Sequence, residues 1–186
     1  LADLQCDFFA LTSVDQGGET LRRVPVRSGD ILRGDRVYAT PVGVTHVTNV
    51  QADLVVRVNR QSLPLFDRGE KRLNLLRLFR RLKVGQVQEW PTQVRRTGGW
   101  IAGRLIAVKR SPQATRAARR RLERQAGKQQ QKVSPASWEA AQYFAVWTSL
   151  AETFAAEAVL ELYRLRWPIG VSSPGHIVQS VRDRPR

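Results

Sequence analysis

The sequence feature that most constrains the fold is a short apolar strand that ends directly at an acidic residue. Ile31 and Leu32 follow a turn-like segment, residues 28–30, and run into Gly34 and Asp35. This pattern places Asp35 at the carboxyl end of a strand, where α/β sheets hold binding and catalytic groups. The same carboxylate also suits a turn or a helix cap, so both interpretations stand.

The segments that follow predict a strand–helix–strand unit. Pro41 fits the first turn of a helix that runs to Asn49, and residues 52–59 (ADLVVRVN) predict a second buried strand. Residues 4–12 are apolar and aromatic, and they predict an earlier strand. With 42% apolar residues among 186, the chain can bury one sizeable core, and we expect an α/β fold.

Residues 73–142 have a different, strongly basic character. Residues 73–82 form a basic amphipathic pattern, and residues 84–96 and 100–109 predict two strands that pair as a hairpin around Gly98-Gly99. Residues 112–132 predict an exposed helix in which Glu123 is the only acid. This middle segment therefore differs in character from the strand–helix–strand unit before it.

The last part predicts a strand at residues 143–150 and a helix at residues 154–167. Pro168 ends that helix near Trp167, because proline lacks the amide donor and clashes with the preceding turn. Residues 168–186 are rich in Gly, Ser, Pro and Arg, and we expect a flexible basic tail unrelated to the rest.

The charge balance favours a polyanionic partner. The chain carries 31 Lys and Arg against 16 Asp and Glu, a net charge of +15, which attracts nucleic acid. Within the basic helix, Arg120 and Arg124 are candidate phosphate contacts, although a charge run also forms an ordinary solvated face and a GC-rich genome also enriches arginine. No apolar run approaches the roughly 20 residues that span a bilayer, so we expect a cytoplasmic, nucleoid-associated protein without membrane contact.

Two aromatic features have both a functional and a packing interpretation. Tyr163 and Arg166 share one helical face with positions 170 and 177, and such a face can meet a phosphate. Alternatively, Tyr163 packs in the core and Arg166 is solvated. Phe144 and Trp147 are able to stack on an extruded base, but their place on a predicted strand favours the core.

The order of these segments resembles a known family. GDRVYATPVGVTHV, ADLVVRVNRQSLPLFD, the basic insertion, YFAVWTSL and AAEAVLELYRLRW together resemble the bacterial insertion-sequence DDE transposases that carry a Tyr-Arg-Glu-Lys signature. The resemblance covers residues 1–167, a partial catalytic domain with its insertion at about 73–142. It implies a ribonuclease-H-like sheet with a strand-rich, basic insertion before the last helix. It also implies DNA transposon ends as partners and a homodimer on DNA as a possible assembly.

The resemblance also assigns roles to single residues. Asp35 matches the second of three catalytic carboxylates, which in the family hold two divalent metal ions, Mg²⁺ or Mn²⁺, for DNA strand cleavage and transfer. Tyr163 and Arg166 match the signature Tyr and Arg, which contact DNA phosphates. Arg36, directly after the carboxylate, is a further candidate for DNA contact.

The departures from the family pattern predict an inactive site. Gly170 stands at the position of the signature Glu, and Ile177 stands at that of the Lys. The family's first Asp lies upstream of the segment matched by residues 1–12, so we expect the chain to begin after it. We hypothesise a frameshift or a junction with unrelated sequence after Trp167.

Three hypotheses follow from the sequence. The leading one is a DDE transposase fragment that is catalytically inactive and still binds DNA. The alternative is a non-catalytic basic nucleic-acid-binding protein that shares only ancestry with transposases. A structural role in a ribonucleoprotein rests on charge alone.

Overall fold

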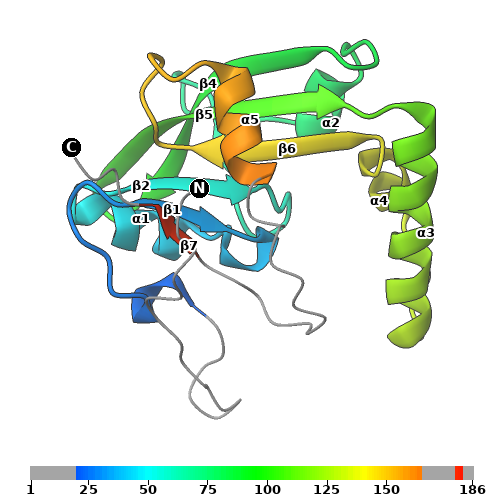
Figure 1. Ribbon diagram of the computed structural model, residues 1–186, viewed down its shortest axis with the longest axis horizontal. Coiled ribbons are helices and arrows are strands. Elements are labelled where there is room, and N and C mark those ends of the chain that lie inside the picture. The colour runs from blue at the N-terminus through cyan, green and yellow to red at the C-terminus, as the bar shows by residue number, and fades with distance from the viewer. Residues whose placement is uncertain (1–19, 165–178, 182–186) are drawn as a thin grey trace.

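The computed structural model describes residues 20–164 and 179–181, which form one mixed sheet with helices on both faces (Figure 1). The strand order is β3-β4-β5-β6-β2-β1-β7. The strands are β1 (Ile31–Gly34), β2 (Asp53–Arg57), β3 (Leu65–Phe66), β4 (Val87–Arg96), β5 (Gly99–Lys109), β6 (Tyr143–Thr148) and β7 (Gln179–Val181). The α/β prediction is therefore confirmed, and the ribonuclease-H-like topology stays a prediction.

The helices begin where the sequence places capping residues. Thr40, Ser111 and Ser134 each accept a hydrogen bond from an amide of the first turn, and each is followed by a proline that suits the first helical position. The helices are α1 (Pro41–Asn49), α2 (Leu75–Phe79), α3 (Pro112–Lys128), α4 (Pro135–Ala140) and α5 (Ala156–Arg164), with 3-10 turns η2 (Leu21–Arg23) and η3 (Arg36–Tyr38).

Strand pairing brings the functional segments to one edge of the sheet. β1 and β2 are parallel with Gly34 opposite Val56, and β6 runs antiparallel to β2 with Val146 opposite Arg57. The carboxyl ends of β1 and β2 therefore lie beside the start of β6. β5, which is antiparallel to β6 with Lys109 opposite Tyr143, ends at this same edge.

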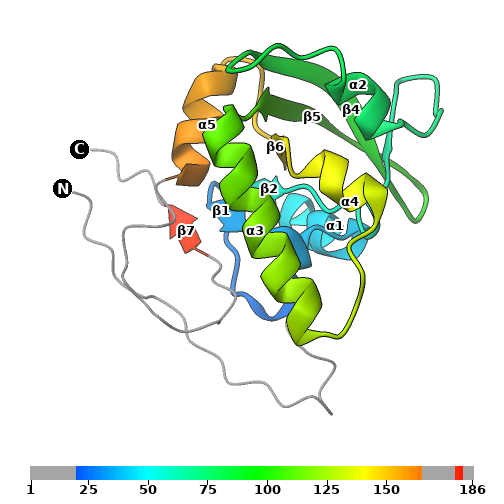
Figure 2. The same cartoon turned by 90° about the vertical axis from the view of Figure 1, so that its right-hand side faces the viewer.

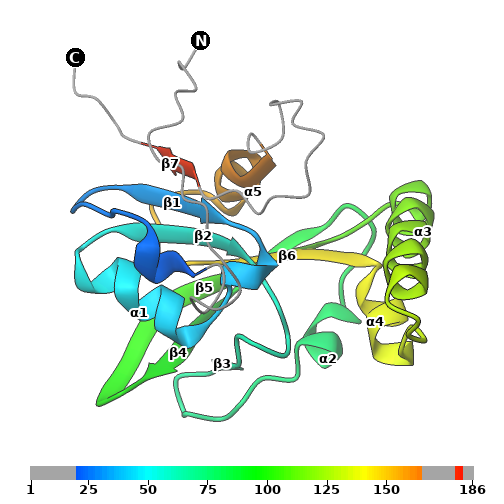
Figure 3. The same cartoon turned by 90° about the horizontal axis from the view of Figure 1, so that it is seen from below.

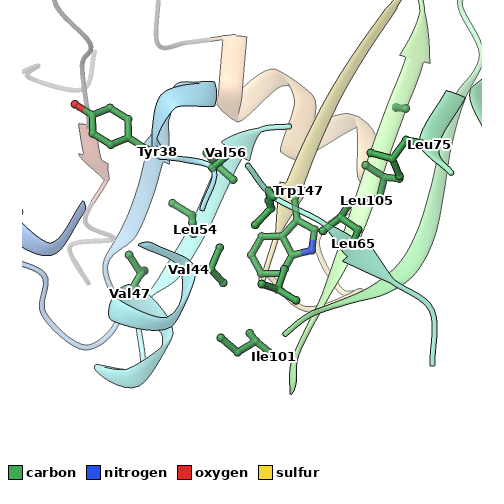
Figure 4. Packing of buried hydrophobic residues seen from close by; sticks show 14 of the residues in the cluster. Tyr38, Val44, Val47, Leu54, Val56, Leu65, Leu75, Ile101, Leu105 and Trp147 are labelled. Carbon is green, nitrogen blue, oxygen red and sulfur yellow. The ribbon is translucent and has the colours of Figure 1, made fainter. Parts of the chain in front are cut away.

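The alternation of apolar residues along the strands divides the core between the two faces of the sheet. On β2, Leu54 and Val56 belong to one cluster together with Val44 and Val47 of α1 (Figure 4). The intervening Val55 belongs to the second cluster, which includes Val159, Leu160 and Tyr163 of α5. Helices α1 and α5 thus cover opposite faces (Figure 3), as the period of two along a strand requires.

The strands of the basic middle segment continue the same sheet. β4 and β5 pair over their whole length as the predicted hairpin, and Gly98 and Gly99 make the turn with φ of 78° and 156°. β5 then pairs with β6, so the hairpin shares the core of the strand–helix–strand unit. The segment at residues 73–82, predicted as basic and amphipathic, contains α2, whose Leu75 and Phe79 are buried.

Among the described elements, the strands β3 and β7, the helix α4 and the two 3-10 turns had no counterpart in the sequence predictions. Strand β7 pairs antiparallel with β1. Within residues 168–186, predicted as a tail, the structure describes only β7. The predicted strand at 4–12 and the positions Arg166, Gly170 and Ile177 lie outside the described residues. No helix among the described residues is long and apolar enough to cross a membrane.

Candidate nucleic-acid interface

Asp35 stands at the end of β1 and caps the turn that follows. Its carboxylate accepts a hydrogen bond from the Arg36 amide at 2.7 Å, and it is the N-cap of η3. The two interpretations of this residue are therefore compatible, because a cap at this position also lies at the carboxyl edge of the sheet. The side chain is half-buried, whereas that of Arg36 is exposed.

Arg57 ends the neighbouring strand and lies at the same edge. Gly34 of β1 lies opposite Val56 of β2, and the two strands are parallel. The next residues along each strand, Asp35 and Arg57, therefore lie at the same edge of the sheet. The Arg57 guanidinium carbon lies 5.9 Å from the centre of the Phe144 ring. The carboxyl end of β2 thus contributes a cation to the edge that holds Asp35.

Phe144 sits among cationic and aromatic neighbours. The Arg110 guanidinium carbon lies 5.4 Å from the centre of the Phe144 ring, and Arg110 Nε donates to the Tyr143 carbonyl at 3.3 Å. The Tyr163 ring lies 5.4 Å from that of Phe144. Of the two candidate stacking residues, Trp147 is fully buried in the core, and half-buried Phe144 lies at the edge of the sheet.

The guanidinium groups around Phe144 repel one another. Burial, together with the nearby charges of Arg57 and Arg121, lowers the pKa of Arg110 to about 10. Among the described residues, the three ion pairs are Arg80–Glu139, Arg104–Glu89 and Arg164–Glu161, so none of them neutralises this group. An anion placed beside these three arginines would relieve their repulsion.

Helix α3 carries further positive charge to this edge. Thr115 is its one buried residue among those described, and Arg120 and Arg124 are exposed. The Arg36 side chain donates to Gln125 Oε1 at 3.3 Å, which places the second half of α3 next to the Asp35 turn. Figure 2 shows α3 running lengthwise across this end of the sheet, in front of the strands. The predicted exposed basic helix is confirmed.

The Tyr163 side chain packs in the core, which is the second of the two interpretations given to it from the sequence. Its side chain is 2% exposed and lies with Val159 and Leu160 in the core cluster under α5. DNA contact by Tyr163 stays a prediction, as does that of Arg166.

The described residues do not form the metal site that the family uses. No three or more His, Cys, Asp or Glu side chains in residues 20–164 lie close enough together to hold a metal ion. Asp35 supplies one carboxylate, and Arg36 and Arg57 lie at the same edge of the sheet. Two divalent ions need several shared acidic ligands, so this arrangement fits an anion better than a metal pair.

Sequence reasoning missed two members of the interface. Arg57 and Arg110 are single arginines at strand ends, and neither belongs to a charge run. The signal was available in the topology, because parallel strands that are joined through one helix end at the same edge of a sheet. Arg57 at the end of the second strand is therefore expected at the same edge as Asp35.

Comparisons with known proteins place the chain in a family. The family model described as "Transposase DDE domain" matches residues 12–169. The putative transposase InsL of insertion sequence element IS186A from Escherichia coli (strain K12) is 30% identical over 173 residues, which are 88% of this chain and 46% of that protein. The transposase for insertion sequence element IS421 from Escherichia coli gives the same values. The chain thus spans about half the length of these relatives. No solved structure matches it.

Proposed function

Because the chain belongs to the insertion-sequence transposases with a DDE domain, we propose that it binds DNA across the edge that holds Asp35 and along α3, without cutting the DNA. The observation that carries this proposal is the cluster of Arg57, Arg110 and Arg121 at the carboxyl edge of the sheet. A backbone phosphate supplies the negative charge that the cluster needs.

The basic helix extends this surface. Residues 120, 124 and 128 recur every four positions, so at 3.6 residues per turn they lie within about 80° of one another on the outward face. Arg121 and Gln125 flank that face, and Gln125 contacts Arg36. The outward face and the arginine cluster therefore form neighbouring parts of one cationic surface, which suits a polyanion that crosses both.

The lack of cleavage is part of the proposal. An in-line phosphoryl displacement on two metal ions needs carboxylates beyond Asp35 to hold the ions about 4 Å apart. At the signature Glu position this chain has Gly170, which offers no ligand, and at the Lys position it has Ile177. Both substitutions support an inactive site. The proposal therefore does not include productive binding of Mg²⁺ or Mn²⁺ by this chain.

The double substitution Arg120→Gln/Arg124→Gln is expected to weaken duplex DNA binding by about tenfold or more at physiological salt. Each lost phosphate contact also removes about 0.9 from the slope of log affinity against log salt, so the slope falls by about two. Fluorescence anisotropy with a labelled duplex at several salt concentrations measures both quantities.

A matched control is Arg22→Gln/Arg27→Gln, which removes the same charge from exposed arginines near η2, on the α1 side of the sheet. We expect a smaller affinity loss and a slope change below one. An equal loss in both double variants would mean that DNA responds only to net charge, and the surface assigned here would be wrong.

A further inference from the structure

A groove with an apolar lining lies between β3 and α2. Its volume is about 340 Å³, which is enough for a large side chain. The lining is mostly apolar and includes Leu63, Leu65, Leu73, Leu75 and Leu76. Arg60 and Arg72 line the same groove. The groove therefore combines leucine side chains with two cations.

The charges of these two arginines are not neutralised by ion pairs. Arg72 is exposed, and neither it nor Arg60 takes part in the three ion pairs of the described residues. Arg60 donates to the Ala136 carbonyl at 3.1 Å, a neutral acceptor. A DNA backbone suits this groove poorly, because the leucines would take phosphate groups out of water without offering them hydrogen bonds. A large apolar side chain with carboxylates on both sides complements it.

The loop between β6 and α5 carries such a side chain. Phe154 is 45% exposed, and Glu152 and Glu157 on either side of it are also exposed. Neither glutamate belongs to an ion pair in the part of the chain that the structure describes. Arg104 donates to the Ala151 and Phe154 carbonyls and so fixes the backbone of this loop. Phe154 is therefore held in place between two carboxylates, which lowers the cost of ordering it in a contact.

This loop does not reach the groove of its own molecule. Leu63 and Leu65 belong to the core cluster on the face of the sheet that α1 covers. The loop leads into α5, which covers the other face, and α2 and α5 lie on opposite sides of the sheet (Figure 3). An occupant with the chemistry of the Phe154 loop must therefore come from a second copy of the chain.

We infer that Phe154 of one copy docks in the groove of a second copy, with Glu152 and Glu157 beside Arg60 and Arg72. The contact removes an aromatic ring from water and brings opposite charges together. Because loop and groove lie on opposite faces, each contact leaves one loop and one groove open, so the copies associate head to tail instead of closing as a two-fold dimer. The contact needs no DNA and is independent of the proposed function.

The test is sedimentation velocity of the full chain without DNA, at concentrations up to about 1 mM, so that weak association is detected. We expect the unmodified chain to form dimers and larger species as its concentration rises. Phe154→Ala and Arg72→Glu are each expected to weaken this association by about tenfold or more, as the loss of an interface anchor does. Val42→Ala is the control, because it removes a side chain that is 57% exposed on α1, and it should leave the association unchanged.

A mixture of the two weakened variants tests the pairing of loop and groove. Phe154→Ala keeps an intact groove and Arg72→Glu keeps an intact loop. The mixture should therefore form a one-to-one dimer, and nothing larger, at concentrations where each variant alone is monomeric. Such a dimer also shows that both variants are folded.

Three results would overturn the inference. The first is an unmodified chain that stays monomeric at every concentration, and the second is a mixture that forms no dimer. The third is an equal loss of association in Val42→Ala and Phe154→Ala, since it would show an unspecific apolar contact. None of these results bears on DNA binding, which is measured separately.

Discussion

Replacing Gly103 with alanine is expected to destabilise the fold by about 3 kcal/mol or more, the upper range for overpacking a rigid core. An added Cβ would lie 2.5 Å from the Thr148 carbonyl oxygen and closer still to the indole of Trp147. Neither neighbour has room to move. Trp147 is fully buried with its indole N–H donating to Thr92 at 3.2 Å, and Thr148 pairs with β5.

Urea unfolding followed by circular dichroism measures this loss. The matched control is Gly127→Ala in α3, where an added Cβ meets nothing within 4 Å. Alanine in an exposed helix is favoured over glycine by about 0.5–1 kcal/mol, so this variant should be equal to or more stable than the unmodified chain. Equal stability of the Gly103→Ala and Gly127→Ala variants would contradict the packing of Trp147 on β5.

Replacing Arg104 with leucine is expected to cost about 3–5 kcal/mol, because it leaves buried acceptors without their donor. The Arg104 side chain is nearly fully buried in the structure. It donates to Glu89 at 2.7 Å and to the carbonyls of Leu150, Ala151 and Phe154 at 3.2, 2.8 and 2.9 Å. These three carbonyls belong to the loop that joins β6 to α5, so one side chain of the hairpin fixes the approach to the last described helix.

The effect of Arg104→Leu should be localised first in that loop. Hydrogen exchange is expected to show lost protection in α5 at conditions where β4 and β5 remain protected. Glu89→Gln is the matched control, because Glu89 is 41% exposed at its side chain and the amide oxygen still accepts from Arg104. It should cost less than about 1 kcal/mol. Uniform loss of protection along the whole sheet would show that Arg104 does not act through the loop.

Much of this architecture is predictable from local sequence, for identifiable reasons. Pro41 and Pro112 mark helix starts because proline suits the first turn, and each follows a residue that caps the helix. Gly98-Gly99 between two alternating segments predicted the hairpin, since both residues adopt positive φ. Asp35 was placed at a strand end from the same kind of local signal.

The features that escaped prediction depend on contacts between distant residues. Helix α4 starts at a Ser134-Pro135 cap like those of α1 and α3, but its six residues include no buried side chain, so neither periodicity nor length indicated it. Arginines far away in sequence hold it. Arg104 looks like any charged residue of a strand until the loop carbonyls are placed around it. Tyr163 illustrates the reverse: its match to a signature indicated DNA contact, whereas its helical face packs it in the core.

The arrangement of the sheet links the basic insertion to the carboxylate edge. β5 ends beside the start of β6, and α3 leaves from that end, so the insertion delivers its arginines to the place where β1 and β2 end. The insertion and the strand–helix–strand unit therefore form one surface in the described part of the chain.

The measurement that tests the central claim most directly is incubation of the full chain with supercoiled plasmid and Mg²⁺ or Mn²⁺, analysed on native and denaturing gels. We predict a salt-sensitive mobility shift on the native gel, weakened by Arg120→Gln/Arg124→Gln, and no nicked or linear product on the denaturing gel. Metal-dependent nicking that Asp35→Ala abolishes would contradict the account, since it would show a complete catalytic site around that carboxylate.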